Sequence, residues 1–501
     1  MIPAKIQTVR GYSVDKTVVT PIQRAQIEKE LTVTPNVPAT YAGAVKPFKV
    51  WIESESRYYL PNAWAKKVFG EAERDSRPTG SVLQTALRFA GTLRPHQVDA
   101  LTAFREAGRS GIICLPCGYG KTFTGIAAAA EIGRAFLIIV HKEFLADQWT
   151  SELQTLLPGI RIGRIQGERC DIGPEFDVSI AMIQTLCSRS YPAGTFHRFG
   201  FAIFDEVHHL GAEHFSQALQ QIQTKYMLGL TATPKRADGL SKVFEWHLGK
   251  IVYQILRRPA DDTVIVEALR YNCDDSAYAE VPTNWKGDTV RAIMINKIAD
   301  YAPRTQAILD WLYPYMTDPA RKLLILSDRR EHLLAFESGF KARGIHSVGY
   351  YVGGMKQKDL DVSAEQRVIL GTYAMASEGM NIPTLNMVLL STPKSNIEQS
   401  VGRILRTKKE DRVVQPMIMD VVDTAFVECF GQWNKRRKFY KECGYTVRWF
   451  GEKTETEIEE RREEPKGVPH FVVEPEDVLT LVGIIPSSEP KKKSGCLITE
   501  D

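Results

Sequence analysis

The sequence of 501 residues lacks the features that mark membrane, secreted or strongly charged proteins. No apolar run approaches the ~18 residues that a membrane span requires. The N-terminal stretch MIPAKIQTVRGY has no apolar core of the kind found in signal peptides, so none is expected. The net charge of +4 is mild and does not by itself call for nucleic acid. We therefore expect an intracellular, soluble protein with no membrane partner, in which any nucleic-acid surface is local.

Cysteine is also sparse, and its spacing does not indicate a metal site. The eight cysteines are scattered. Cys114 and Cys117 have C-x-x-C spacing, but no second pair follows at the distance of a zinc site. Buried thiols in a reducing compartment are expected. Hydrophobic residues at 44% and charged residues at 25% are ordinary for a globular protein, and the length suggests about three domains.

Short apolar runs alternate with amphipathic segments in two parts of the chain, which predicts two α/β units with doubly wound parallel sheets. In the first unit, strands are expected at 111–115, 135–140, 178–182, 201–204 and 227–230. In the second, they are expected at 322–326, 347–351, 367–371, 387–390 and 416–420. The expected sections are a small N-terminal accessory domain that is a candidate for DNA binding (1–90), the first unit (91–250), a linker or insert (251–302), the second unit (303–430) and a charged, partly disordered C-terminal extension (431–501).

The stretch 110–122, SGIICLPCGYGKT, is typical of a loop that wraps a phosphate chain. Its glycines allow backbone N–H groups to turn inward, and the helix that follows offers its N-terminus to negative charge. Compared with the pattern G-x-x-x-x-G-K-[ST], the first glycine is replaced by Leu115. The expected nucleotide-binding residues of the loop are Pro116, Cys117, Gly118, Tyr119, Gly120, Lys121 and Thr122.

Two adjacent carboxylates, Asp205 and Glu206, follow the expected strand 201–204. Ligands of open α/β sheets gather at such strand ends. Phosphoryl transfer needs a carboxylate that holds Mg²⁺ and a group that orients or deprotonates the attacking water. Asp205 fits the first role and Glu206 the second, and the hydroxyl of Thr122 would complete the Mg²⁺ shell.

Other polar residues could serve the same nucleotide. Gln97 carries both a donor and an acceptor, which suits an adenine edge. Thr231 and Thr233 follow a strand, where switching hydrogen bonds could report the nucleotide state. Arg403 and Arg406 stand three residues apart, so one helix face could aim both at an anion, although a plain basic surface helix has the same pattern. An arginine that meets the transferring phosphoryl group accelerates the reaction by roughly 10³–10⁵.

Six motifs follow one another across about 91–430: LRPHQ, PCGYGKT, DEVHH, TATP, TYAMASEGMNIP and QSVGRILR. Together they resemble superfamily 2 helicases and translocases, and within them the branch of XPB and UvsW. The stretches IIVHKEFLADQW (138–149) and YYLPNAWAKKVFG (58–70) resemble helicases of large DNA viruses, of the poxvirus transcript-release type. The resemblance implies two tandem RecA-like lobes with ATP and Mg²⁺ in the cleft between them.

The resemblance also implies roles for single residues. His208 would couple the lobes, Gly379 would lie near the ribose and the strand, and Gln399 would join both arginines at the γ-phosphate. Thr231 and Thr233 would link hydrolysis to the nucleic-acid track. The implied contacts to the nucleic-acid backbone are Lys142, Gln184, Thr185 and Thr372.

Three functions remain open. The first is an ATP-dependent double-stranded DNA translocase or 3′-to-5′ helicase that unwinds, migrates branches or displaces bound complexes. The second is an RNA helicase or a transcript-release factor. The third is a motor subunit of a restriction-type complex. TATP and QSVGRILR differ from the DEAD-box forms, which favours DNA, double-stranded or branched. Transcription or replication proteins are expected partners of the N-terminal domain and the C-terminal tail, in the cytoplasm, the nucleus or a viral factory.

Overall fold

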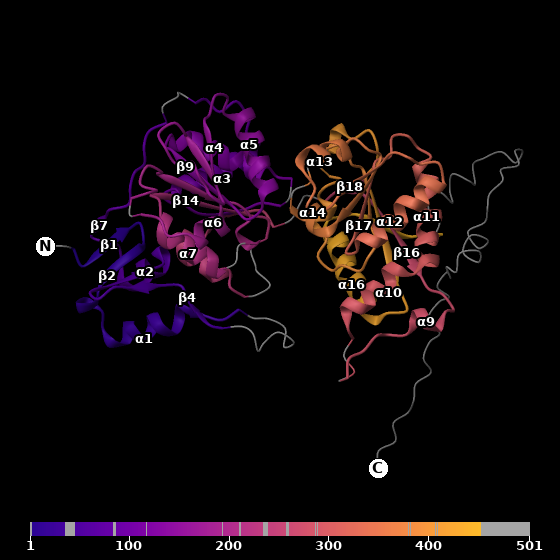
Figure 1. The fold of residues 1–501 in the computed structure, drawn as a ribbon, viewed down its shortest axis with the longest axis horizontal. Coiled ribbons are helices and arrows are strands. Elements are labelled where there is room, and N and C mark those ends of the chain that lie inside the picture. The colour runs from indigo at the N-terminus through magenta and orange to yellow at the C-terminus, as the bar shows by residue number, and fades with distance from the viewer. Residues whose placement is uncertain are drawn as a thin grey trace, which may run out of the picture. The chain divides into compact units, whose positions relative to one another are not determined.

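The structure, a computed structural model, describes most of residues 3–451 in two compact units, Met1–Arg258 and Pro259–Asp501. Each unit is built around one large parallel sheet (Figure 1). The expected charged tail lies outside the described residues. The segments that are not described are 1–2, 36–45, 84–86, 117, 193, 210–211, 234–238, 257–259, 286, 288, 379, 381, 406, 408 and 452–501.

A five-stranded sheet, in the order β5-β6-β2-β1-β7, opens the first unit. The aromatic side chains of Tyr12, Trp51, Tyr58 and Trp64 are buried against it. They form a small core, so these rings are not available to stack on bases. The elements are β1 (Lys5–Thr8), β2 (Gly11–Asp15), α1 (Pro21–Glu30), β5 (Ile52–Glu53), β6 (Arg57–Leu60), α2 (Asn62–Phe69) and β7 (Arg74–Asp75), beside a separate pair, β3 (Thr32–Val33) and β4 (Phe48–Lys49).

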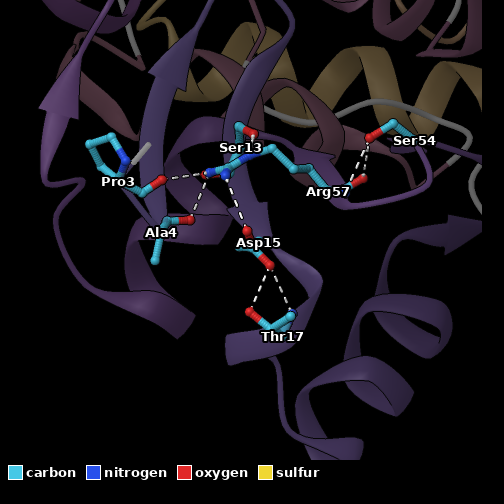
Figure 2. A network of polar contacts seen from close by, with 7 residues as sticks. All are labelled: Pro3, Ala4, Ser13, Asp15, Thr17, Ser54 and Arg57. Atoms are coloured by element: carbon cyan, nitrogen blue, oxygen red, sulfur yellow. Dashed lines mark hydrogen bonds and ion pairs between the residues drawn. The ribbon is translucent and has the colours of Figure 1, made fainter. Parts of the chain in front are cut away.

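Arg57 ties the strands of this small sheet together (Figure 2). Its guanidinium donates to the carbonyl of Ala4 at 2.7 Å, and its Nε donates to Ser13 Oγ at 2.6 Å. The carboxylate of Asp15 lies 3.6 Å from the same guanidinium. The backbone N–H of Thr17 donates to the Asp15 carboxylate, and so does the Thr17 hydroxyl. These two hydrogen bonds and the charge of Arg57 lower the pKa of that carboxyl. The network fixes the start of the chain against β2 and β6.

The large sheet of the first unit has eight strands in the order β11-β10-β12-β9-β13-β14-β8-β15, and every neighbouring pair except β10 with β11 is parallel. One face packs on α3, α4 and α5, and the other on α6, α7 and α8, with α2 of the N-terminal part packed on α8. The central strand β9 is therefore buried at all five positions, as expected for a parallel strand covered on both faces. The bounds are β8 (Ser110–Cys114), β9 (Phe136–Val140), β10 (Ile162–Gln166), β11 (Arg169–Cys170), β12 (Val178–Met182), β13 (Phe201–Phe204), β14 (Tyr226–Thr231), β15 (Ile251–Gln254), α3 (Pro95–Glu106), α4 (Lys121–Ile132), α5 (Glu143–Leu156), α6 (Ile183–Ser188), α7 (Ala212–Ile222) and α8 (Ser241–Leu248).

The second unit has a seven-stranded sheet in the order β18-β19-β17-β20-β21-β16-β22, parallel throughout. All its strands therefore end at one carboxyl edge. The bounds are β16 (Ile265–Tyr271), β17 (Leu323–Ser327), β18 (Val348–Tyr351), β19 (Val368–Thr372), β20 (Met387–Leu390), β21 (Met417–Asp423), β22 (Thr446–Trp449), α9 (Ser276–Ala279), α10 (Arg291–Asp300), α11 (Ala302–Met316), α12 (Arg330–Ala342), α13 (Gln357–Ala364), α14 (Tyr373–Glu378), α15 (Glu398–Val401) and α16 (Val427–Glu442).

Helix α16 is docked on this sheet by a buried ion pair. The guanidinium of Arg436 donates to both oxygens of Asp420 at 2.8 Å, and the hydroxyl of Tyr440 donates to the same carboxylate at 2.7 Å. Trp433 is also buried. These residues of α16 therefore pack inward and hold the helix on β21.

The predicted fold class is confirmed: two α/β lobes with parallel sheets follow a small N-terminal sheet. All ten predicted strands are present within one residue of their expected starts. Residues 251–302 contain β15, which pairs with β8 in the first unit, and β16, which pairs with β21 in the second. Among the described residues, the structure has no helix that is both long and apolar enough to cross a membrane.

Candidate nucleotide and coupling site

The loop between β8 and α4 has the backbone that a phosphate loop needs. Gly118 has a φ of +84° and Gly120 a φ of +76°, a region that residues with a Cβ rarely adopt. A Cβ built on Gly120 would lie 2.3 Å from Nε2 of Gln97. Lys121 and Thr122 begin the first turn of α4. Cys117 of this loop lies outside the described residues.

Gln97, predicted at the adenine edge, supports this loop. Its side chain is 3% exposed, and its Nε2 donates to the carbonyls of Tyr119 at 3.3 Å and Gly120 at 3.4 Å. Its Oε1 accepts the backbone N–H of Arg94 at 2.8 Å. The amide therefore joins the start of α3 to the phosphate loop, a role that the sequence did not reveal.

Lys121 and Glu206 form an ion pair, with Nζ 3.2 Å from Oε1. Glu206 has a φ of +47°, the left-handed region, and costs of order 1–3 kcal/mol of backbone strain for a residue that is not glycine. Strain of this size persists only where the surroundings enforce it. The turn after β13 thus holds a carboxylate toward the phosphate loop.

Asp205 is the most deeply buried acid of the site, with 5% of its surface exposed. The indole Nε1 of Trp149 donates to its Oδ2 at 2.8 Å, and the backbone N–H of Glu206 donates to its Oδ1 at 3.0 Å. Burial raises the pKa of Asp205 to about 6, the charge of Glu206 adds to this, and the bond from Trp149 and the charge of Lys121 oppose it. A nearby divalent cation would favour the ionised form.

Trp149 is a site residue that the sequence did not reveal. It lies on α5, inside the stretch 138–149 that carried the resemblance, but no role was assigned to it. A carboxylate at a buried strand end needs hydrogen-bond donors. That need is the only feature of the sequence that indicates a donor such as Trp149 near Asp205.

A chain of side-chain contacts continues from Glu206 to the end of β14. Nδ1 of His208 lies 3.4 Å from Oε2 of Glu206 and 2.8 Å from Oγ1 of Thr231. The hydroxyl of Thr231 donates to the carbonyl of Thr233 at 2.8 Å. The Thr231 oxygen must then accept from His208, so we infer that the imidazole carries a proton on Nδ1. Lys121, Glu206, His208 and Thr231 therefore form one connected set, the coupling chain.

The residues implied for nucleic acid in the first unit lie at the same carboxyl edge, because β9 and β12 are parallel neighbours. Lys142 precedes α5, and the exposed Gln184 donates to the carbonyl of His141 at 2.9 Å. Thr185 is 8% exposed, and its hydroxyl accepts the N–H of Gly167 at 3.1 Å. Gln184 is accessible to a ligand, whereas Thr185 serves local structure.

In the second unit, Arg403 is buried and braces its own lobe. It donates to the carbonyls of Ala376 at 2.5 Å and Met380 at 2.9 Å. Gln399 is half-buried on α15, and Thr372 is the last residue of β19. Gly379 and Arg406, two more predicted site residues, lie outside the described residues.

The first unit's fold and site together define a P-loop nucleoside triphosphatase, and known structures share the two-lobe fold. The structure of Dbp5 from S. cerevisiae, bound to RNA and ADP BeF3, matches with a TM-score of 0.51 at 13% identity over 72% of this chain and 90% of that chain. At this identity the likeness shows the fold alone. A family model described as "Type III restriction enzyme, res subunit" matches residues 90–236, which contain the phosphate loop and the coupling chain.

Known sequences give the family. A protein of Acanthamoeba polyphaga mimivirus, named "Putative ATP-dependent RNA helicase L396", is 33% identical over 448 residues, 87% of this chain and 85% of the relative. A Halobacterium salinarum protein named "Putative DNA 3'-5' helicase Rad25" is 36% identical over 172 residues, 34% of this chain and 28% of the relative. The chain belongs to the superfamily 2 helicases and is an ATP-dependent nucleic-acid helicase of that superfamily. The predicted superfamily is confirmed, and a giant virus encodes a relative.

Proposed function

We propose that this helicase acts on DNA: it couples ATP hydrolysis to movement along double-stranded or branched DNA. The coupling chain is the observation that carries the coupling of hydrolysis to movement, and it serves a DNA or an RNA track equally. It links the lysine of the phosphate loop to the threonines at the end of β14 within hydrogen-bond or ion-pair distance at every step. A change at the phosphates can therefore alter hydrogen bonds at the strand end. The motif forms TATP and QSVGRILR, together with the relative named as a DNA helicase, favour DNA as the track.

The chemistry of the donor set fits Mg²⁺. Asp205 offers a carboxylate and Thr122 a hydroxyl, the hard oxygen ligands that Mg²⁺ prefers alongside phosphates and water. Bound there, the ion would neutralise charge on the phosphates. Lys121 holds the outer phosphates, and Glu206 orients the attacking water once ATP draws the lysine away from it.

The second unit supplies the remaining groups of the proposed reaction. Arg406 and Gln399 act on the γ-phosphate. Arg403 first holds the segment around Ala376 and Met380 in place, and then acts on the γ-phosphate as well. Lys142, Gln184 and Thr372 contact the nucleic-acid backbone, which binds such grooves mainly through phosphates.

RNA is the second candidate substrate. The mimivirus relative, which spans most of this chain, carries RNA helicase in its name. Under this alternative the same coupling chain drives movement on RNA or release of a transcript.

Displacement of a third strand tests the proposal. A duplex DNA that carries a triplex-forming oligonucleotide reports movement along the duplex, and a matched RNA duplex with a 3′ overhang reports movement on RNA. We expect ATP-dependent release of the DNA third strand by the wild-type protein and none by Lys121→Ala. Unwinding of the RNA duplex without any release from DNA would show that the RNA alternative is correct.

A further inference from the structure

The most exposed large aromatic side chain among the described residues is Trp285, at 89%. It stands between Thr283 and Thr289, which close a short hairpin in the second unit whose residues 286 and 288 lie outside the described residues. Thr283 and Thr289 pair as an antiparallel bridge, and the N–H of Gly287 donates to the carbonyl of Asn284 at 3.0 Å. Trp285 directly follows Asn284, and its indole is presented to solvent at a cost in apolar hydration.

The hairpin is fixed to the carboxyl edge of the sheet. It belongs to the connection that follows β16 and leads directly into α10. Arg329, which comes just after β17, donates to the carbonyl of Ala292 at 3.2 Å and to Oδ1 of Asn296, both on α10. These bonds tie the base of the hairpin to the turn between β17 and α12.

A second tie joins the hairpin to the start of α16. The hydroxyl of Thr289 donates to the carboxylate of Glu428, in the first turn of that helix, which follows β21. Figure 1 labels α10 and α16 near each other in the second unit. The tip therefore projects from an anchored base at the edge where β19 ends in Thr372.

Positive charge is exposed along the same carboxyl edge of the sheet. Arg291, the first residue of α10, and Arg330, the first residue of α12, are both exposed. Lys356 and Lys358 follow β18 on the same edge and are exposed as well. An exposed aromatic ring among cations is the combination that binds single strands, because every base has a π-face and every linkage a phosphate.

We propose that the 283–289 hairpin is a base-stacking element, on which Trp285 takes an unpaired base of the nucleic acid while Arg291 and Arg330 attract its phosphates. The proposal rests on the proposed function in one respect: the protein must act on a nucleic acid. That nucleic acid can be DNA or RNA. A protein partner is the competing occupant, since Val427 and Phe430 on α16 are also exposed, at 83% and 45%. Lysine is depleted in protein interfaces, and the exposed Lys356 and Lys358 at the same edge favour a polyanion over a protein here.

Two variants of Trp285 test the stacking. Trp285→Ala removes the ring, Trp285→Phe keeps a smaller one, and Tyr313→Ala changes another exposed aromatic of the second unit as the matched control. The affinity for single-stranded DNA and RNA oligonucleotides is measured by fluorescence anisotropy. Stacking on one base predicts that Trp285→Ala weakens binding about 5- to 100-fold, with partial recovery in Trp285→Phe and no change in Tyr313→Ala.

A second readout reports the stack itself. Oligonucleotides that carry 2-aminopurine should lose fluorescence on binding the wild-type protein and regain it with Trp285→Ala. Unchanged affinity and quenching in Trp285→Ala, with a wild-type protein that binds nucleic acid, would overturn the stacking proposal and leave the proposed function intact. A wild-type protein that binds no single strand but still releases the third strand from duplex DNA would overturn the stacking proposal alone, whereas one that binds neither single strands nor duplex DNA would contradict the proposed function.

Discussion

Burial makes the ionised form of Asp205 costly in the protein without ligands. Its pKa is raised from 3.8 to about 6, so the folded state holds a proton that the unfolded state releases between these values. Stability therefore falls as the pH rises from about 4 to 6, and the full cost persists above 6. The proposed role of Asp205 as a ligand of Mg²⁺ explains why a carboxylate stands there.

Asp205→Asn should thus stabilise the protein while abolishing its ATPase activity. We expect a gain of about 1–3 kcal/mol in the free energy of unfolding at pH 8, and a smaller gain at pH 4.5. Urea unfolding in the presence of a chelator and without nucleotide measures both. Asp300→Asn, at an exposed position, is the control. An equal effect at the two pH values would contradict the assigned pKa.

Trp149→Phe should shift the pH dependence of turnover. Loss of the indole N–H removes a hydrogen bond to the ionised form, so the pKa of Asp205 rises further. At Mg²⁺ concentrations below saturation, where protons compete with the ion for Asp205, we expect ATPase activity to fall about tenfold near pH 6 and much less at pH 8, as a hydrogen bond to a charged group is worth about 1.5–3 kcal/mol. Trp51→Phe, which changes a buried indole packed against the N-terminal sheet, should change the ATPase activity at neither pH. The same loss at every pH would mean that Trp149 only packs.

At this scale the sequence predicted the acids, the lysine and the threonines, because their spacing after apolar runs follows from strand ends. It did not predict Trp149. A hydrogen bond between a helix and a strand end 56 positions away is set by tertiary packing and leaves no local pattern.

At the scale of elements, the phosphate loop depends on α3 through Gln97. If that amide only supports the loop, Gln97→Ala should weaken the binding of ATP and GTP equally, by roughly tenfold, the effect of losing about 1.4 kcal/mol. If it also reads adenine, as predicted from the sequence, discrimination between ATP and GTP should be lost. Titration with fluorescent analogues of both nucleotides separates the two. Unchanged affinity for both would contradict each role.

Apart from β18, whose burial alternates at the edge of its sheet, the predicted strands are buried along most of their length, so they read as continuous apolar runs. β16 was missed because it carries Glu267, whose carboxylate accepts from Trp311 Nε1 at 2.8 Å and Tyr315 at 2.6 Å. A buried acid breaks the apolar run although its partners satisfy it. β10 lies near one end of its sheet, and its side chains are alternately buried and half-buried. Its mixed sequence therefore gave no strong pattern either.

For the whole molecule, both units must act in one catalytic cycle. Arg406→Ala should leave ATP affinity within about threefold of wild type and slow turnover by roughly 10³-fold, because an arginine at the transferring phosphoryl group acts in the transition state. Single-turnover hydrolysis measures this. Lys409→Ala is the control for a nearby cation, because the ion pair that Lys409 forms with Asp262 is exposed. Normal turnover in Arg406→Ala would remove the second unit from the reaction.

The ATPase rate measured with different nucleic acids tests the central claim most directly. Double-stranded DNA, forked DNA, single-stranded DNA and RNA are compared as activators at equal nucleotide concentration, with Lys121→Ala as the inactive reference. A DNA-driven motor predicts strong stimulation by duplex or forked DNA and weak stimulation by RNA. Stimulation by RNA alone would contradict it.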